Sequence, residues 1–100
     1  MKSKKYTISS KIFLWQGASA WHFVAIPKKE SENIKKVFSE KKRGWGSLRV
    51  LVVLGKTTWA TSIFPDSKSG QYLLPLKQEV RAKEGVANGD IIHFKLEVEG

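Results

Sequence analysis

Residues 91–99 carry the most regular alternation of apolar and polar side chains in the sequence. Every second residue is apolar and those between are polar or charged: Ile92, Phe94, Leu96 and Val98 alternate with His93, Lys95, Glu97 and Glu99. Successive side chains of a β-strand point to opposite sides of the sheet, so this spacing predicts a strand with one face in a core and the other in water. This segment therefore constrains the chain to a β-sheet fold.

Five further segments are typical of strands, and several of them are apolar on both faces. They cover residues 6–16, 21–26, 48–54, 57–64 and 72–74. Gly55 and Lys56 predict a two-residue hairpin, because glycine supplies the positive φ that such a turn needs. About six strands of this kind suit a closed or nearly closed barrel better than an open sheet, since closure removes exposed strand edges.

Two short helices are predicted between the strands. Residues 28–39 have apolar side chains at the spacing of an amphipathic helix, and residues 76–84 predict a second helix that Gly85 ends. Proline lies at the switch from strand to helix in both places, at Pro27 and Pro75. The order of strand, proline, helix, glycine-containing turn and strand therefore occurs twice. We expect a mainly β, closed or nearly closed barrel of about six strands with two short helices and a pseudo-twofold repeat.

The length predicts a single domain, residues 1–100, with one core. Hydrophobic residues make up 41% of the sequence, which argues against a disordered chain. The sequence has no cysteine, which excludes disulfides and thiolate metal sites. It also has no apolar run of about 20 residues that would span a membrane. We expect a soluble cytoplasmic protein that does not bind membranes.

Most of the positive charge lies in the first part of the sequence. The net charge is +9, and residues 1–43 hold eleven Lys and Arg against three Glu, which leaves +8 of it there. A basic patch is predicted at Lys35, Lys36, Lys41, Lys42 and Arg43. Such a field attracts anionic partners. The alternative interpretation is a solvated, lysine-rich face that keeps the protein soluble.

A candidate binding site for an anion is predicted within residues 57–81. Its polar, aromatic and cationic side chains are Thr61, Ser62, Tyr72, Lys77 and Arg81. Lys77 and Arg81 are four residues apart and so share one face of the predicted second helix, where they would hold a phosphate or carboxylate. The alternative is that the aliphatic stems of both cations only cover an end of the barrel.

The four tryptophans allow two interpretations. They are Trp15, Trp21, Trp45 and Trp59. Beside a basic patch, exposed indoles would be platforms on which nucleic-acid bases stack. We favour core positions, because large aromatic residues mostly fill the core in a domain of this size.

No catalytic, metal or cofactor signature is found in the sequence. Thr61 and Ser62 lack the Gly-x-Ser-x-Gly elbow of a hydrolase. His22 and His93 have no neighbouring ligand at metal spacing. The glycines around Trp45 follow a predicted helix instead of opening one, which is the wrong order for a phosphate loop. We therefore expect a protein that is not an enzyme and holds no metal or cofactor.

Several motifs, distributed over almost the whole chain, resemble a known family. They are Trp21-His22-Phe23-Val24 with Pro27, Arg43-Gly44-Trp45-Gly46-Ser47, Thr58-Trp59-Ala60-Thr61-Ser62-Ile63-Phe64-Pro65, Tyr72-Leu73-Leu74-Pro75-Leu76-Lys77, and Val80-Arg81 with Gly85 and Gly89-Asp90. With these motifs the chain resembles a small bacterial and archaeal domain family of unknown function, sometimes found ahead of a YdeI/OmpD-associated region. The resemblance implies a compact β-barrel with short helices and no established activity.

A second resemblance is to the half-barrel of AbrB-type transcription regulators, which bind DNA as dimers. It rests on Leu74-Pro75, Val80-Arg81, Gly85 and Gly89-Asp90 before the final strand. If the two repeated units form a fused pair of that kind, this resemblance implies DNA binding. Our first hypothesis is a non-catalytic binding or interaction module for an anionic small ligand or a protein partner. The alternative is a nucleic-acid-binding, AbrB-like domain.

Overall fold

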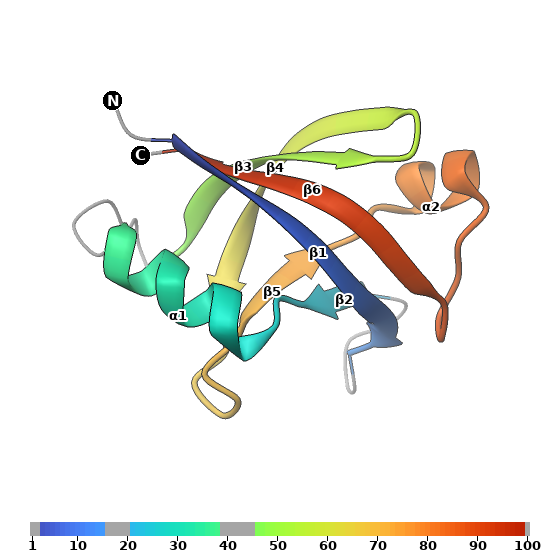
Figure 1. Cartoon of the computed structure of the whole chain (residues 1–100). Coiled ribbons are helices and arrows are strands. Elements are labelled where there is room, and N and C mark those ends of the chain that lie inside the picture. Colours follow the sequence, from blue (N-terminus) through green and yellow to red (C-terminus); the bar gives the residue numbers. More distant parts are fainter. Residues whose placement is uncertain (1–2, 16–20, 39–45, 100) are drawn as a thin grey trace.

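The computed structural model of the chain describes residues 3–15, 21–38 and 46–99. These residues form a closed antiparallel barrel of six strands with two helices (Figure 1). The strands are β1 (Ser3–Leu14), β2 (His22–Ala25), β3 (Leu48–Leu54), β4 (Thr57–Pro65), β5 (Tyr72–Pro75) and β6 (Ile91–Glu99), and the helices are α1 (Lys28–Val37) and α2 (Gln78–Glu84). The predicted mainly β barrel with two short helices is confirmed. Neither helix is long and apolar enough to cross a membrane.

The barrel has a twofold topology. The strands follow one another in the order β1-β2-β5-β4-β3-β6, and every neighbouring pair is antiparallel. If β1 is exchanged with β4, β2 with β5 and β3 with β6, every strand keeps the same set of neighbours around the closed barrel. The symmetry axis passes between β2 and β5, where Val24 lies opposite Leu74. The chain is therefore built from two equivalent units, β1-β2-α1-β3 and β4-β5-α2-β6, as the repeated pattern predicts.

Pro27 and Pro75 are not at equivalent positions of the two units, although the sequence pattern predicts that they are. Pro27 is the N-cap of α1, but the N-cap of α2 is Lys77, and Pro75 lies within β5. The pairing of β2 with β5 extends one residue beyond Pro75, because the Leu76 amide donates to the carbonyl of His22 at 2.9 Å. The second helix consequently begins at Gln78, two residues later than predicted. The structural equivalent of Pro27 is therefore Lys77, which follows Pro75 by two residues.

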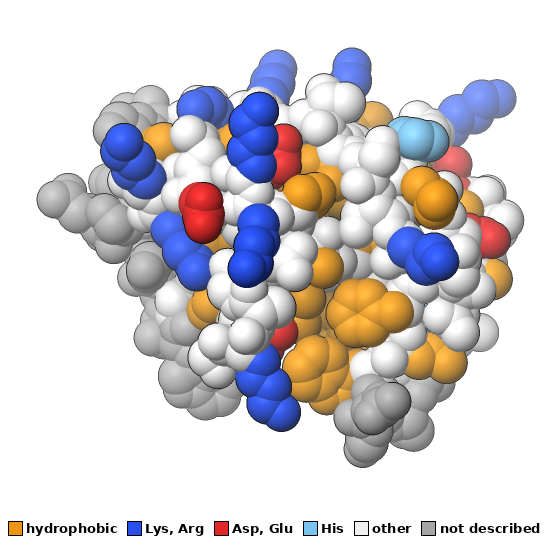
Figure 2. Space-filling model, turned by 60° about the horizontal axis from the view of Figure 1, so that its bottom comes forward, with side chains coloured by type: hydrophobic (Ala, Val, Ile, Leu, Met, Phe, Trp, Pro, Cys, Tyr) orange, Lys and Arg blue, Asp and Glu red, His pale blue; other side chains and the backbone are white. Residues whose placement is uncertain are grey.

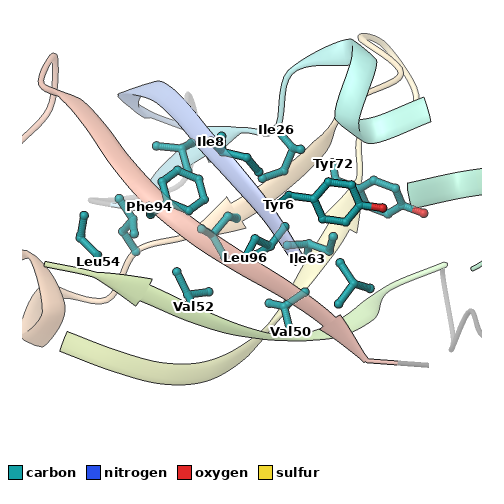
Figure 3. Close-up of a cluster of buried hydrophobic side chains, with 14 of the residues drawn as sticks. Tyr6, Ile8, Ile26, Val50, Val52, Leu54, Ile63, Tyr72, Phe94 and Leu96 are labelled. Atoms are coloured by element: carbon teal, nitrogen blue, oxygen red, sulfur yellow. The ribbon is translucent and has the colours of Figure 1, made fainter. Parts of the chain in front are cut away.

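The barrel interior is filled by every second residue of the strands. Figure 3 shows side chains from β1, β3, β4, β5 and β6 pointing towards one another around this core. The four apolar residues that alternate along β6 are all buried, which confirms the strand predicted from its spacing. Helix α1 contributes Ile34, which is fully buried, and α2 contributes Val80. Both helices therefore pack their apolar side against the barrel.

Two glycines with similar backbone angles provide a matched test of this packing. Gly55 (φ +58°) is in the β3–β4 hairpin, and a Cβ there would clash with Oε1 of Glu84, whose other oxygen accepts a hydrogen bond from Thr57. Gly85 (φ +64°) is the C-cap of α2, and a Cβ there would have no neighbour within 4 Å. We expect Gly85→Ala to lower the free energy of unfolding by about 1 kcal/mol through backbone strain alone.

Gly55→Ala should have a larger effect, about 2 kcal/mol, because the Glu84 carboxylate must also move and lose the bond from Thr57. Urea unfolding of both variants measures the difference. In a Glu84→Ala background the two substitutions should become equally destabilising. Equal effects in the wild-type background would contradict the close approach of Glu84 to the hairpin.

Candidate functional site

The outer surface of the barrel has an apolar hollow of about 350 Å³ over β2, β5 and the end of β4, next to the residue that follows β1. We call it the aromatic hollow; it is lined by Trp15, Trp21, Phe23, Phe64, Pro65, Asp66 and Leu73. Three of the large side chains are substantially exposed, with 56% for Trp21, 41% for Trp15 and 40% for Phe64. Figure 2 shows hydrophobic side chains gathered on this side of the molecule, with Lys and Arg side chains around them. Exposed aromatic side chains in a hollow are typical of a binding surface.

The alternation of the strands places these rings outside the barrel. Val24 and Leu74 point into the core, so their neighbours Phe23 and Leu73 face outward. The ring of Trp21 stacks on Phe23 with centroids 5.9 Å apart and an angle of 17° between the planes. Trp15 meets the same ring edge-on at 5.6 Å. Phe23 therefore contacts both indoles and links them into one aromatic cluster.

The prediction that the tryptophans fill the core is wrong for Trp15 and Trp21. Trp15 directly follows β1 and Trp21 directly precedes β2, and both continue the outward-facing side, because Ile12 and Val24 occupy the inward positions. Trp59 is half-buried and packs against the core, and Trp45 lies outside the described residues. Positions 13 and 15 lie an odd number of residues away from the buried Ile12, and positions 21 and 23 likewise from the buried Val24. Because side chains alternate along a strand, this spacing could have predicted that the aromatic residues face outward.

A second hollow, of about 310 Å³, adjoins the first at Trp21. We call it the basic hollow; it is lined by Trp21, His22, Pro75, Leu76, Lys77, Gln78 and Arg81. Lys77 is exposed and Arg81 is half-buried. In the described part of the chain, neither cation forms an ion pair. Their positive charge is therefore available to an anion from solution.

The twofold topology explains how Arg81 reaches this position. In the first unit, Ser31 lies four residues after the N-cap of α1, and its Oγ donates to the carbonyl of Ile26 at 2.8 Å. Arg81 is the equivalent residue of the second unit, and its Nε donates to the carbonyl of Leu76 at 3.3 Å. The serine side chain has no atoms beyond the hydroxyl that makes this hydrogen bond. The arginine side chain is longer than that of serine and continues past the carbonyl to which its Nε donates. The hydrogen bond to Leu76 therefore fixes the guanidinium in place, and its other N–H groups remain available at the basic hollow.

The structure brings together Lys77 and Arg81 but separates the other three predicted site residues from them. Thr61 and Ser62 are consecutive residues of β4 and so point to opposite faces of the strand. Tyr72 is fully buried in the core, where its hydroxyl has no hydrogen-bond partner among the described residues. Burial raises the pKa of the Tyr72 phenol above its ordinary value of 10.0. These three residues line neither hollow.

The predicted basic patch is only partly described. Lys36 is exposed on α1, and Nζ of Lys35 donates to the carbonyl of Gly70 at 2.9 Å. Residues 41–43 lie outside the described residues. Lys35 therefore helps to fasten α1 to the turn between β4 and β5. The role of the patch in binding stays a prediction.

One further polar pair, Ser9 and His93, lies on the surface away from the aromatic and basic hollows. Ser9 and His93 lie opposite each other on β1 and β6, with Oγ and Nδ1 2.5 Å apart, and both are exposed. This contact is a cross-strand hydrogen bond on the outer face of the barrel, beside a hollow of about 270 Å³ that His93 lines together with Thr7 and Lys95. Within the described ranges, no three metal-binding side chains gather at one place.

Comparison with known proteins gives one family. The model of a family described as "Domain of unknown function (DUF1905)" matches residues 9–96. None of the curated proteins matches the chain. The matched region contains both hollows, all of α1 and α2, and at least part of every strand.

Proposed function

The chain belongs to the family of unknown function DUF1905, and we propose that its barrel is a non-catalytic binding module for a ligand that combines a flat apolar group with an anionic group. The aromatic hollow would receive the flat group and the basic hollow the anion. The sequence predicted only that the ligand is anionic. The aromatic hollow adds the expectation that the ligand also has a flat apolar group. It concerns binding only, and no reaction step is assigned.

The observation that carries this proposal is the shared position of Trp21. The indole lines both hollows, so a ring stacked against it lies next to the two cations. Ligand sites generally combine an apolar surface, which supplies most of the affinity, with a few polar groups that fix orientation. Here the polar groups are Lys77 and Arg81, and Gln78 adds an amide.

The charges of the two hollows would orient the ligand. Asp66 lines the aromatic hollow but not the basic one, and Lys77 and Arg81 line only the basic one. A ligand whose anion lay in the aromatic hollow would meet the Asp66 carboxylate, which disfavours it. The reverse orientation pairs the anion with two cations. The net charge of +9 adds attraction at longer range.

The dye 1-anilinonaphthalene-8-sulfonate tests this function, because it combines flat rings with a sulfonate. We expect the dye to bind and its fluorescence to rise. Trp21→Ala should weaken binding about fivefold or more through loss of the stacking surface. Lys77→Ala should weaken it less, and the loss should shrink as salt is added. Fluorescence titration at two salt concentrations measures each effect.

Two control variants leave both hollows intact. Ile91, which is 61% exposed on β6, and Lys95, exposed on the same strand, line neither hollow. Ile91→Ala and Lys95→Ala should bind the dye as the wild type does. If the dye binds equally well to Trp21→Ala, or if Ile91→Ala weakens it as much, the function is not located at these hollows.

A further inference from the structure

We propose that the ligand of the two hollows is a segment of single-stranded nucleic acid, a step that rests on the binding function proposed above. A base would stack in the aromatic hollow on Trp21, and the phosphate beside it would lie in the basic hollow between Lys77 and Arg81. Nucleotides join a flat ring to an anion in every repeating unit. They therefore have the combination of groups that the two hollows accept.

The shape of the surface favours a chain over a compact small molecule. Sites for small ligands usually enclose most of the molecule they bind. Both hollows are instead open to solvent on the outer side of the barrel, and they lie one after the other with Trp21 between them. An extended polymer can cross such a surface and place successive units in successive hollows. A single compact ligand would leave one hollow or much of its own surface in water.

The kinds of side chain also match single-strand recognition. Proteins that bind single strands without sequence preference combine aromatic platforms with a positively charged track for the backbone. Trp15, Trp21 and Phe64 supply exposed rings, and Lys77 and Arg81 supply cations without ion pairs in the described part of the chain. The anchored guanidinium of Arg81 suits phosphate, because its remaining N–H groups form a planar fork.

Double-stranded DNA fits this surface less well. In a duplex the bases stack on one another, so their faces are not available to Trp21. Reading a duplex groove requires a helix or a ribbon that protrudes into it. The rings here line a hollow instead, against the outer face of β2 and β5. The proposal therefore differs from the DNA binding implied by the AbrB-type resemblance.

Fluorescence anisotropy with a labelled oligothymidylate of eight nucleotides tests the proposal. We expect binding near 50 mM NaCl, with a slope of log K against log salt of about −1.4 for two phosphate contacts. Lys77→Ala should halve that slope. Trp21→Ala should weaken binding about tenfold at every salt concentration measured, because base stacking does not depend on counterions. Lys95→Ala, on β6, should change neither the affinity nor the slope. A duplex of equal length and the mononucleotide dTMP should bind at least tenfold more weakly.

Each opposite result overturns the proposal. Equal binding of duplex would exclude a single-strand site, and equal binding of dTMP would identify a small ligand. An equal loss in Lys77→Ala and Lys95→Ala would show nonspecific attraction to the charge of the whole protein. If the oligonucleotide fails to bind while the naphthalene dye binds through Trp21, only the nucleic-acid proposal is lost. If neither probe binds, both proposals fail.

Discussion

Leu74→Ala is expected to lower the free energy of unfolding by about 2–5 kcal/mol. Leu74 is fully buried in β5, opposite Val24 of β2, at one of the strand pairings that join the two units of the barrel. The substitution removes apolar contacts and leaves a cavity that neighbouring strands cannot easily fill, because the barrel is closed. A domain of this size is stabilised by only about 5–15 kcal/mol, so the loss is a large fraction of the total.

Thermal and urea unfolding, followed by circular dichroism, measure this effect. The melting temperature should fall by more than about 10 °C. Ile91→Ala is the matched control, since it also shortens an aliphatic side chain but at a position that is 61% exposed. It should change stability by less than about 0.5 kcal/mol. A Leu74 variant as stable as the control would contradict the position of Leu74 at the centre of the β2–β5 pairing.

Ser31→Ala is expected to cost about 2–3 kcal/mol, a large effect for the loss of one oxygen. Ser31 is fully buried in α1, and its Oγ accepts a hydrogen bond from the amide of Tyr72 at 3.0 Å while donating to the carbonyl of Ile26. That carbonyl also accepts a bond from Gln71 at 3.0 Å and so keeps a partner. The amide of Tyr72 would be left buried without one, which carries the desolvation cost of an unpaired donor.

The same unfolding measurements test the serine, with Ser67→Ala as the control. Ser67 is exposed in the turn between β4 and β5, and its replacement should be close to neutral. Hydrogen exchange adds a local readout, because the Tyr72 amide should exchange faster in Ser31→Ala than in the wild type. Unchanged stability together with unchanged protection of that amide would show that Ser31 does not join α1 to β5.

The fold could be predicted because strand periodicity is a local property of the sequence. The alternation along β6 and the two-residue hairpin at Gly55 both depend on neighbours within a few residues. The twofold repeat was also visible, although the two prolines indicated a different alignment. The N-cap of α2 is set by the hydrogen bond from Leu76 to His22, a contact between the two units that no local pattern contains.

The site could be predicted only in part, for a related reason. Lys77 is the N-cap of α2 and Arg81 follows it by four residues within the helix, so both reach one hollow and their spacing was informative. Thr61 and Ser62 were grouped although consecutive strand residues must diverge. The exposure of Trp21 depends on which side of β2 faces the core. That choice follows from the pairing with β5, fifty residues further along the chain.

The pairing of β1 with β6 determines how this barrel can be joined to other proteins. Ser3 lies opposite Glu99, so the two ends of the described chain are neighbours, with Cα atoms about 5 Å apart as in any antiparallel pair (Figure 1). Connections made at both ends would leave from a single point on the surface. The two ends are therefore placed as insertion into a surface loop of a host protein requires. In Figure 1 this point is at the upper left, at the far end of β1 from its pairing with β2.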